Sequence, residues 1–146
     1  MKDAAPVLYP NEKVAIRVSE YADSHSLALP QHVLDYHDHV ETTQSNPHLM
    51  ISNFQAKSGI FLARLIGAKR STFPLFAASI EALRLLVLEI GVFVGYSSMA
   101  WSHAVGPEGK VTGLEFSDEY AKTAREAFES KGIKNVEIIV GDALET

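Results

Sequence analysis

The strongest constraint on the fold is a change of pattern near residue 87, after which short apolar stretches alternate with helical ones. The stretch LEIGVFVGYSSMAW, residues 88–101, has the pattern of a buried strand, a glycine turn and a helix. Continuous apolar strands are typical of parallel sheets that are buried on both faces. Strand–helix alternation predicts an open parallel α/β sheet with right-handed crossovers. The expected strands are 87–90, 110–116 and one within 135–142, and the expected helices are 97–105 and 117–132.

Three helices are expected ahead of the sheet. Residues 1–50 form a predicted helical segment, and residues 51–146 form the predicted domain that contains the sheet. Asn11 can cap the first helix, Pro30 suits the first turn of the second, and Asn53 begins the third. The residues expected on the apolar sides of these helices are Val14, Val18 and Tyr21; Val33, His37 and Val40; and Phe54, Phe61, Leu62 and Leu65.

Composition narrows the class of protein. The chain of 146 residues has a net charge of −5 and no cysteine, which excludes disulfides, thiolate zinc sites and cysteine nucleophiles. Its lysines and arginines form no basic run, which argues against a nucleic-acid or anionic-membrane partner. No stretch approaches the roughly 18 apolar residues of a membrane span. A cytoplasmic protein is therefore expected.

The glycine turn and two acidic positions predict an adenosyl cofactor. The turn has the spacing E-x-G-x-x-x-G, with Glu89, Gly91 and Gly95, and a turn of this kind places a ligand at a helix N-terminus. It lacks the G-x-G-x-x-G spacing of dinucleotide-binding proteins, so NAD is disfavoured. Glu115 ends the second strand, where a carboxylate can accept both ribose hydroxyls. Asp142 follows the third strand, where it can border an adenine.

Three stretches carry a resemblance to a known family. LIGAKR, VLEIGVFVGYSSMAWSHAVGPEGKVTGLEFSDEYAKTARE and NVEIIVGDALET resemble the cation-dependent, caffeoyl-CoA-type (family 3) S-adenosylmethionine O-methyltransferases, especially fungal ones. The resemblance covers nearly all of residues 50–146. It implies a Rossmann-like methyltransferase fold, here with a partial parallel sheet of three strands.

The resemblance also implies site residues. Ser52, which has the plain helix N-cap as its other interpretation, matches a position that closes over the cofactor. The remaining roles are Glu89, Gly91 and Gly95 in the cofactor turn, Ser97 near the methionine carboxylate, Glu115 on the ribose, and Asp142 and Ala143 at the adenine. No catalytic residue is assigned.

Two departures from the family pattern shape the remaining expectations. The family delivers an aspartate and a later Asp-Asn pair to a divalent metal after GDALET, so we expect the metal ligands and the acceptor-binding half to be absent. The first strand would then be an open edge, and such edges recruit another chain. We expect a homodimer or larger oligomer through this strand, the N-terminal helices or an inserted helix. The insertion is STFPLFAASIEALRLL, residues 71–86. One interpretation is a helix that forms a lid or an oligomer surface, and the other is an accident of gene structure.

Histidines elsewhere are expected to be structural or solvated. His32, His37 and His39 occur with Asp35 and Asp38 in HVLDYHDHV, but side chains two apart on a helix point away from each other. His103 is expected to be satisfied or exposed rather than a general base, and no metal site is predicted.

The resulting functional hypothesis is an S-adenosylmethionine-dependent O-methyltransferase-family protein that acts on a small hydroxylated aromatic or secondary metabolite. One alternative is a catalytically silent cofactor-binding or scaffold subunit. Another is a repurposed, non-methylating enzyme of secondary metabolism, such as a cyclase or dehydratase. Its ionisable candidates would be His25, His37, Glu89 and Tyr96.

Overall fold

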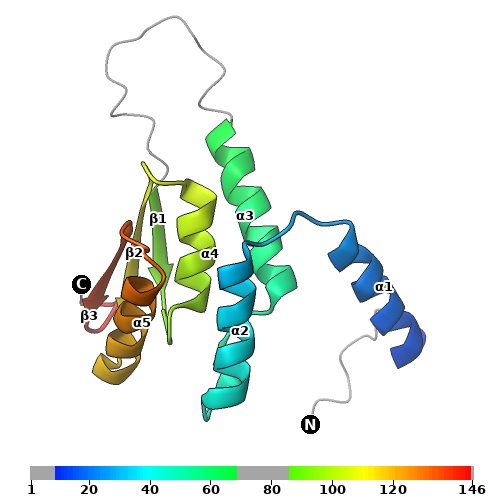
Figure 1. The fold of residues 1–146 in the computed structure, drawn as a ribbon, viewed down its shortest axis with the longest axis horizontal. Helices are drawn as coiled ribbons and strands as arrows, with labels where there is room; N and C mark the ends of the chain where they lie inside the picture. The colour runs from blue at the N-terminus through cyan, green and yellow to red at the C-terminus, as the bar shows by residue number, and fades with distance from the viewer. Residues whose placement is uncertain (1–8, 69–85, 146) are drawn as a thin grey trace, which may run out of the picture.

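The chain forms five α-helices, one short 3-10 helix and three strands within the residues that the computed structural model describes, which are 9–68 and 86–145. Figure 1 shows the N-terminal helices beside the unit of alternating strands and helices. In chain order the elements are α1 (Glu12–Ser24), α2 (Gln31–Thr43), η1 (Pro47–Leu49), α3 (Asn53–Ala68), β1 (Leu86–Ile90), α4 (Tyr96–Val105), β2 (Lys110–Glu115), α5 (Asp118–Ser130) and β3 (Val136–Val140).

The three strands form a parallel sheet in the order β1-β2-β3. Glu89 of β1 lies opposite Gly113 of β2, which in turn lies opposite Ile138 of β3. Because side chains alternate across a strand, these three residues share one face of the sheet. The three expected strands and the two expected helices that connect them are confirmed, with bounds that differ by one or two residues from those predicted.

Local capping signals set the helix ends. The side chain of Asn11 accepts a hydrogen bond from the Val14 amide at 3.0 Å, and that of Ser117 accepts one from the Tyr120 amide at 3.3 Å. Gly132 follows α5 with φ of +67°, a conformation that favours glycine at a helix C-terminus. All three ends were predicted from residue type alone.

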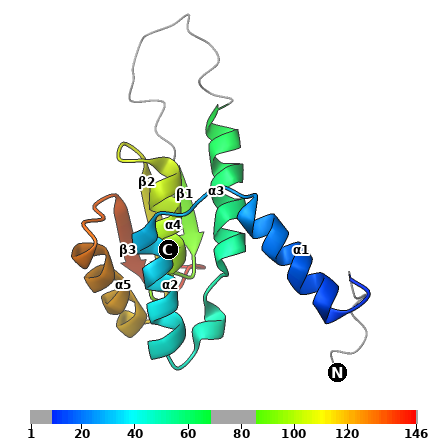
Figure 2. The same cartoon turned by 45° about the vertical axis from the view of Figure 1, so that its right-hand side comes forward.

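The helices cover one face of the sheet in two layers. The first layer, α4 and α5, packs on the strands, and α2 and α3 pack on α4 (Figures 1 and 2). Val111 on β2 and Met99 on α4 are almost fully buried between sheet and helices, while Val33 and Ile60 bring α2 and α3 into the same core. The site described below lies where this core meets the carboxyl end of β1.

The expected apolar side of α3 is wrong. The residues predicted to be buried, Phe54, Phe61, Leu62 and Leu65, are exposed, whereas Ala56, Lys57 and Ile60 are buried. Gly59 explains the difference, because a Cβ placed there would lie 2.5 Å from the Trp101 ring. The helix therefore approaches α4 through small residues and Ile60, and the other large apolar residues named here stay outside.

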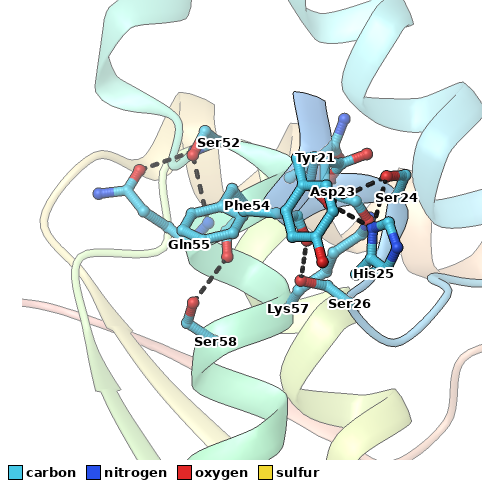
Figure 3. A network of polar contacts seen from close by, with 12 residues as sticks. Tyr21, Asp23, Ser24, His25, Ser26, Ser52, Phe54, Gln55, Lys57 and Ser58 are labelled. Carbon is cyan, nitrogen blue, oxygen red and sulfur yellow. Dashed lines mark hydrogen bonds and ion pairs between the residues drawn. The ribbon is translucent and has the colours of Figure 1, made fainter. Parts of the chain in front are cut away.

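The first helix also differs from expectation. None of the residues of α1 is buried, and Val18 and Tyr21 are exposed. In both ribbon views α3 lies between α1 and the sheet. The end of α1 is held by Lys57, whose Nζ lies 2.6 Å from Asp23 Oδ1 (Figure 3). The helix is thus tethered by an ion pair rather than by an apolar stripe.

On α2 the buried residues are Val33, Tyr36 and Val40. The prediction was right for Val33 and Val40, but the third core residue is Tyr36 and not His37. The side chain of His37 is only 14% exposed and its ring meets the edge of Tyr96, with 4.9 Å between ring centroids. The tyrosine is the better core residue because its hydroxyl reaches a buried acceptor, as described below.

The opposite face of the sheet is open. Leu86, Leu88 and Ile90 are 69%, 65% and 73% exposed, and β1 pairs with β2 alone among the described strands. The expected inserted helix, residues 71–86, lies outside the described residues except for Leu86, which begins β1. Among the described helices, none is both long and apolar enough to cross a membrane.

Self-association through this strand stays a prediction. Light scattering coupled to size exclusion at micromolar protein should give the mass of a dimer or larger species, because an apolar edge strand pairs readily with another chain. The variant Leu88→Lys should shift the mass to that of a monomer, while Ile16→Lys on α1 should not. A monomeric wild-type protein would contradict the expectation, and a loss of assembly in Ile16→Lys alone would place the contact on the N-terminal helices.

Candidate site at the carboxyl end of the first strand

The turn between β1 and α4 is built from three residues in the left-handed region. Gly91, Phe93 and Gly95 have φ of +83°, +52° and +93°. A Cβ on Gly95 would lie 2.8 Å from the Phe128 ring, so this glycine is required both by conformation and by space. A Cβ on Gly91 would meet no atom within 4 Å, so the backbone there is open to an approaching ligand. Phe93 is not a glycine, and its conformation must be held by its surroundings.

A buried carboxylate from β2 holds this turn. Oε2 of Glu115 accepts hydrogen bonds from the Val92 and Phe93 amides at 2.9 and 2.7 Å, and Oε1 accepts one from the Ser117 amide at 2.9 Å. Charge-assisted bonds of this kind are about twice as strong as neutral ones. The residue predicted to bind a ribose therefore also fixes the backbone of the glycine turn.

Sequence reasoning missed Gly113, which makes room for the turn. A Cβ at this position would lie 2.4 Å from Cγ2 of Val92. Gly113 lies in the middle of β2 in VTGLE, and a glycine inside a strand often marks a close approach of other atoms. That signal was present in the sequence, but the partner across the sheet could not be identified from it.

A cavity of 670 Å³ opens between α3 and the β1–α4 turn. It brings together Glu89, Gly91 and Ser97 of the predicted site with Phe93 and Tyr96. It is also lined by apolar side chains, which include Met50, Ile51, Leu62, Leu88 and Trp101. Polar groups and apolar side chains thus line the same cavity.

Glu89 is the buried acid of this cavity. Burial raises the pKa of its carboxyl group, and the nearby charge of Glu115 acts in the same direction. Hydrogen bonds from Ser97, Ser98 and Trp101 act in the opposite direction without cancelling the effect of burial. A cationic ligand group would relieve this carboxylate, because an opposite charge stabilises the ionised form.

The first turn of α4 offers backbone donors beside the same cavity. The N-cap residue is Gly95, and no side chain of the described residues caps the helix. Amides at a helix N-terminus carry partial positive charge and favour an anionic group. An anion site and a carboxylate for a cation therefore lie next to each other.

Three further residues of the predicted site, Asp142, Ala143 and Ser52, do not line this cavity. Asp142 and Ala143 follow β3, at the same edge of the sheet as Glu115, and Asp142 Oδ1 accepts from the Leu144 amide at 2.9 Å. Ser52 caps α3: its Oγ accepts from the Gln55 amide at 3.2 Å, and the Gln55 side chain accepts from the Ser52 amide at 2.9 Å (Figure 3). Ser52 lines a separate cavity near α1, although its neighbours Met50 and Ile51 line the first one.

Histidine positions offer little for metal chemistry near the turn. Among the described residues, one group of three potential ligands has its atoms within 4.8 Å of one another: His37, Asp38 and Glu41 on α2. His32, His39 and Asp35 are not part of it, and exposed acidic groups are common without an ion. The strand ends and the turn, as far as the structure describes them, supply no such group.

His103 is satisfied, as expected. Its Nε2 lies 3.0 Å from a guanidinium nitrogen of Arg64. Burial first, and then the charges of Arg64 and His32, lower the pKa of His103. The ring is therefore neutral and engaged at neutral pH.

Comparison with known proteins identifies the family. The sequence profile of a family described as O-methyltransferase matches residues 30–146. The chain belongs to this O-methyltransferase family. It is 40% identical over 101 residues to catechol O-methyltransferase of Mycobacterium tuberculosis. The aligned region covers 68% of this chain and 39% of that protein. It is also 43% identical over 56 residues to protein-L-isoaspartate O-methyltransferase 2 of Archaeoglobus fulgidus, covering 38% of this chain and 26% of that protein.

Solved structures agree on the fold. The SAH-bound methyltransferase PaMTH1 of Podospora anserina matches with a TM-score of 0.74 and 28% identity, over 95% of this chain and 53% of that one. The O-methyltransferase TomG of Streptomyces achromogenes, in complex with SAM, matches with a TM-score of 0.65 and 26% identity. This match covers 88% of this chain and 51% of the TomG chain. The fold is the α/β SAM-methyltransferase fold, with three parallel strands and N-terminal helices. The chain spans about half the length of these two proteins.

The burial of Glu89 predicts a particular pH dependence of stability. Because its pKa is raised above the ordinary 4.5, the folded protein keeps a proton that the unfolded chain loses between pH 4.5 and the raised value. The free energy of unfolding contributed by this group therefore falls as pH rises through that window. Urea unfolding across this range should show the fall in the wild type and in the exposed control Glu129→Gln, but not in Glu89→Gln. Parallel curves for wild type and Glu89→Gln would contradict it.

The close approach at Gly113 predicts a coupled pair. Gly113→Ala should destabilise the fold by roughly 1–3 kcal/mol, because the new Cβ overlaps Val92 and pushes on the turn. Val92→Ala removes the atoms that the Cβ meets, so the double variant should be more stable than the sum of the single effects allows. Denaturant unfolding of the four proteins gives this coupling energy, and simple additivity would show that the contact is unimportant.

Proposed function

We propose that this chain binds S-adenosylmethionine in the turn between β1 and α4 and takes part in methyl transfer to a hydroxyl group of a small aromatic acceptor. The observation that carries the proposal is the cavity in which Glu89, the Gly91 backbone and the N-terminus of α4 lie together. The methionine part of the cofactor carries an ammonium and a carboxylate, which are the two charges that these groups favour.

The ribose would be held by Glu115, with a restriction that the hydrogen bonds impose. A carboxylate has about four acceptor sites, and three are taken by the Val92, Phe93 and Ser117 amides. About one site on Oε1 is left, enough for a single ribose hydroxyl without breaking a turn contact. The second hydroxyl would need another partner, and the adenine would lie toward Asp142 and Ala143 at the end of β3.

The acceptor would lie against the apolar side chains that line the cavity. Met50, Leu62 and Trp101 offer flat and apolar contacts to an aromatic ring. The similarity to a catechol O-methyltransferase supports an aromatic hydroxyl as the acceptor group. Methyl transfer depends mainly on placing the acceptor oxygen in line with the methyl group and the sulfur.

Calorimetric titration with S-adenosylhomocysteine tests the cofactor step. The wild-type chain should bind it and should not bind NAD⁺, because the turn lacks the dinucleotide spacing. Glu89→Gln should weaken binding by about tenfold through loss of the charged partner of the ammonium, while Glu129→Gln should bind as the wild type does. Absence of binding at millimolar ligand would overturn the proposal.

The second candidate function is that of a silent subunit, which binds the cofactor without catalysing methyl transfer. Assays with catechols, with and without magnesium, separate the two. Methylated product supports the enzyme, and binding without product supports the silent subunit.

A further inference from the structure

A tyrosine from the N-terminal helices reaches the β1–α4 turn at a different backbone group from those that Glu115 binds. The hydroxyl of Tyr36 on α2 donates a hydrogen bond of 2.6 Å to the carbonyl of Val94, 58 residues later in the chain. Tyr36 is 6% exposed and Val94 is fully buried. Burial raises the pKa of Tyr36 to about 12, so the hydroxyl keeps its proton and donates at all physiological pH values.

The two contacts divide the polar groups of the turn between them. Glu115 takes the amides of Val92 and Phe93, and Tyr36 takes the carbonyl that follows them. Phe93, with φ of +52°, lies between these two anchors. A left-handed conformation at a residue other than glycine persists only where several contacts enforce it.

We propose that Tyr36 is a positioning residue for the cofactor: its hydrogen bond keeps the β1–α4 turn in the conformation that binds ligand, and so couples helix α2 to cofactor affinity. The inference rests on the proposed cofactor site. It assigns a functional role to a residue of the N-terminal segment that does not line the cavity.

The coupling follows from populations. If the turn samples other conformations when the Val94 carbonyl loses its donor, only a fraction of the molecules can bind. The apparent dissociation constant then rises by the inverse of that fraction. The contacts of the Tyr36 ring, with Lys131 Nζ at 5.4 Å from its centroid and with His39, do not need the hydroxyl. Removing the oxygen therefore isolates the hydrogen bond.

The test is Tyr36→Phe in the full chain, with Tyr120→Phe as the matched control. Tyr120 packs its ring against Phe93 with 4.7 Å between centroids, and its hydroxyl makes no hydrogen bond within the described residues. Tyr36→Phe should raise the dissociation constant of S-adenosylhomocysteine by about five- to tenfold, and Tyr120→Phe should leave it unchanged. Equal affinity of Tyr36→Phe and wild type would overturn the inference.

Amide hydrogen exchange without ligand provides a second, independent readout. The Gly95 amide, bonded to the Val92 carbonyl at 3.0 Å, reports on the turn, and the Val111 amide, bonded to the Asn135 carbonyl at 2.9 Å, reports on the sheet. Tyr36→Phe should accelerate exchange at Gly95 more than at Val111. Equal acceleration at both would indicate a purely structural role and overturn the inference.

The two readouts also separate this inference from the proposed function. If the wild-type chain fails to bind S-adenosylhomocysteine, the proposed function fails, and exchange at Gly95 alone decides whether Tyr36 positions the turn. If the wild-type chain binds and Tyr36→Phe binds equally well, the proposed function stands and the role of Tyr36 is rejected.

Discussion

The carboxylate of Glu115 is the constraint on which the site depends. It lies at the end of β2, is 8% exposed, and accepts three backbone amides, two of them from the turn that follows β1. A buried charge is tolerated when it is hydrogen-bonded, and here two amides of the turn and the Ser117 amide provide those bonds. The turn and the carboxylate therefore stabilise each other, and both are placed by the parallel pairing of β1 with β2.

Glu89 and Glu115 show how neighbouring acids acquire different roles. Both are buried, but Glu115 is surrounded by backbone donors, whereas burial dominates at Glu89 and raises its pKa. A carboxylate that is costly to ionise in the free protein is suited to a cationic ligand, since binding supplies the missing charge. The stability cost at Glu89 and its proposed role in binding thus have the same physical origin.

The alternation of strands and helices along the chain, the helix caps and the glycine turn could be predicted because each depends on nearby residues. Asn11 and Ser117 cap their helices with bonds that span three residues, and the Gly91–Gly95 spacing defines its own turn. The apolar side of α3 could not be predicted, because it is decided by the approach of Trp101 to Gly59, far apart in the sequence. Tyr36 was missed for the same reason: its acceptor is a backbone carbonyl, which no side-chain pattern reveals.

The alternation of β1 links the ligand site to the open face of the sheet. Val87 and Glu89 point to the face covered by helices, while Leu86, Leu88 and Ile90 point to the open one. A shift of β1 by one residue would turn Glu89 to the open face of the sheet and turn its apolar neighbours to the face covered by helices. Any partner that pairs with the outer edge of β1 would hold its register as well. Association at that edge would therefore act on cofactor binding through the position of a single carboxylate.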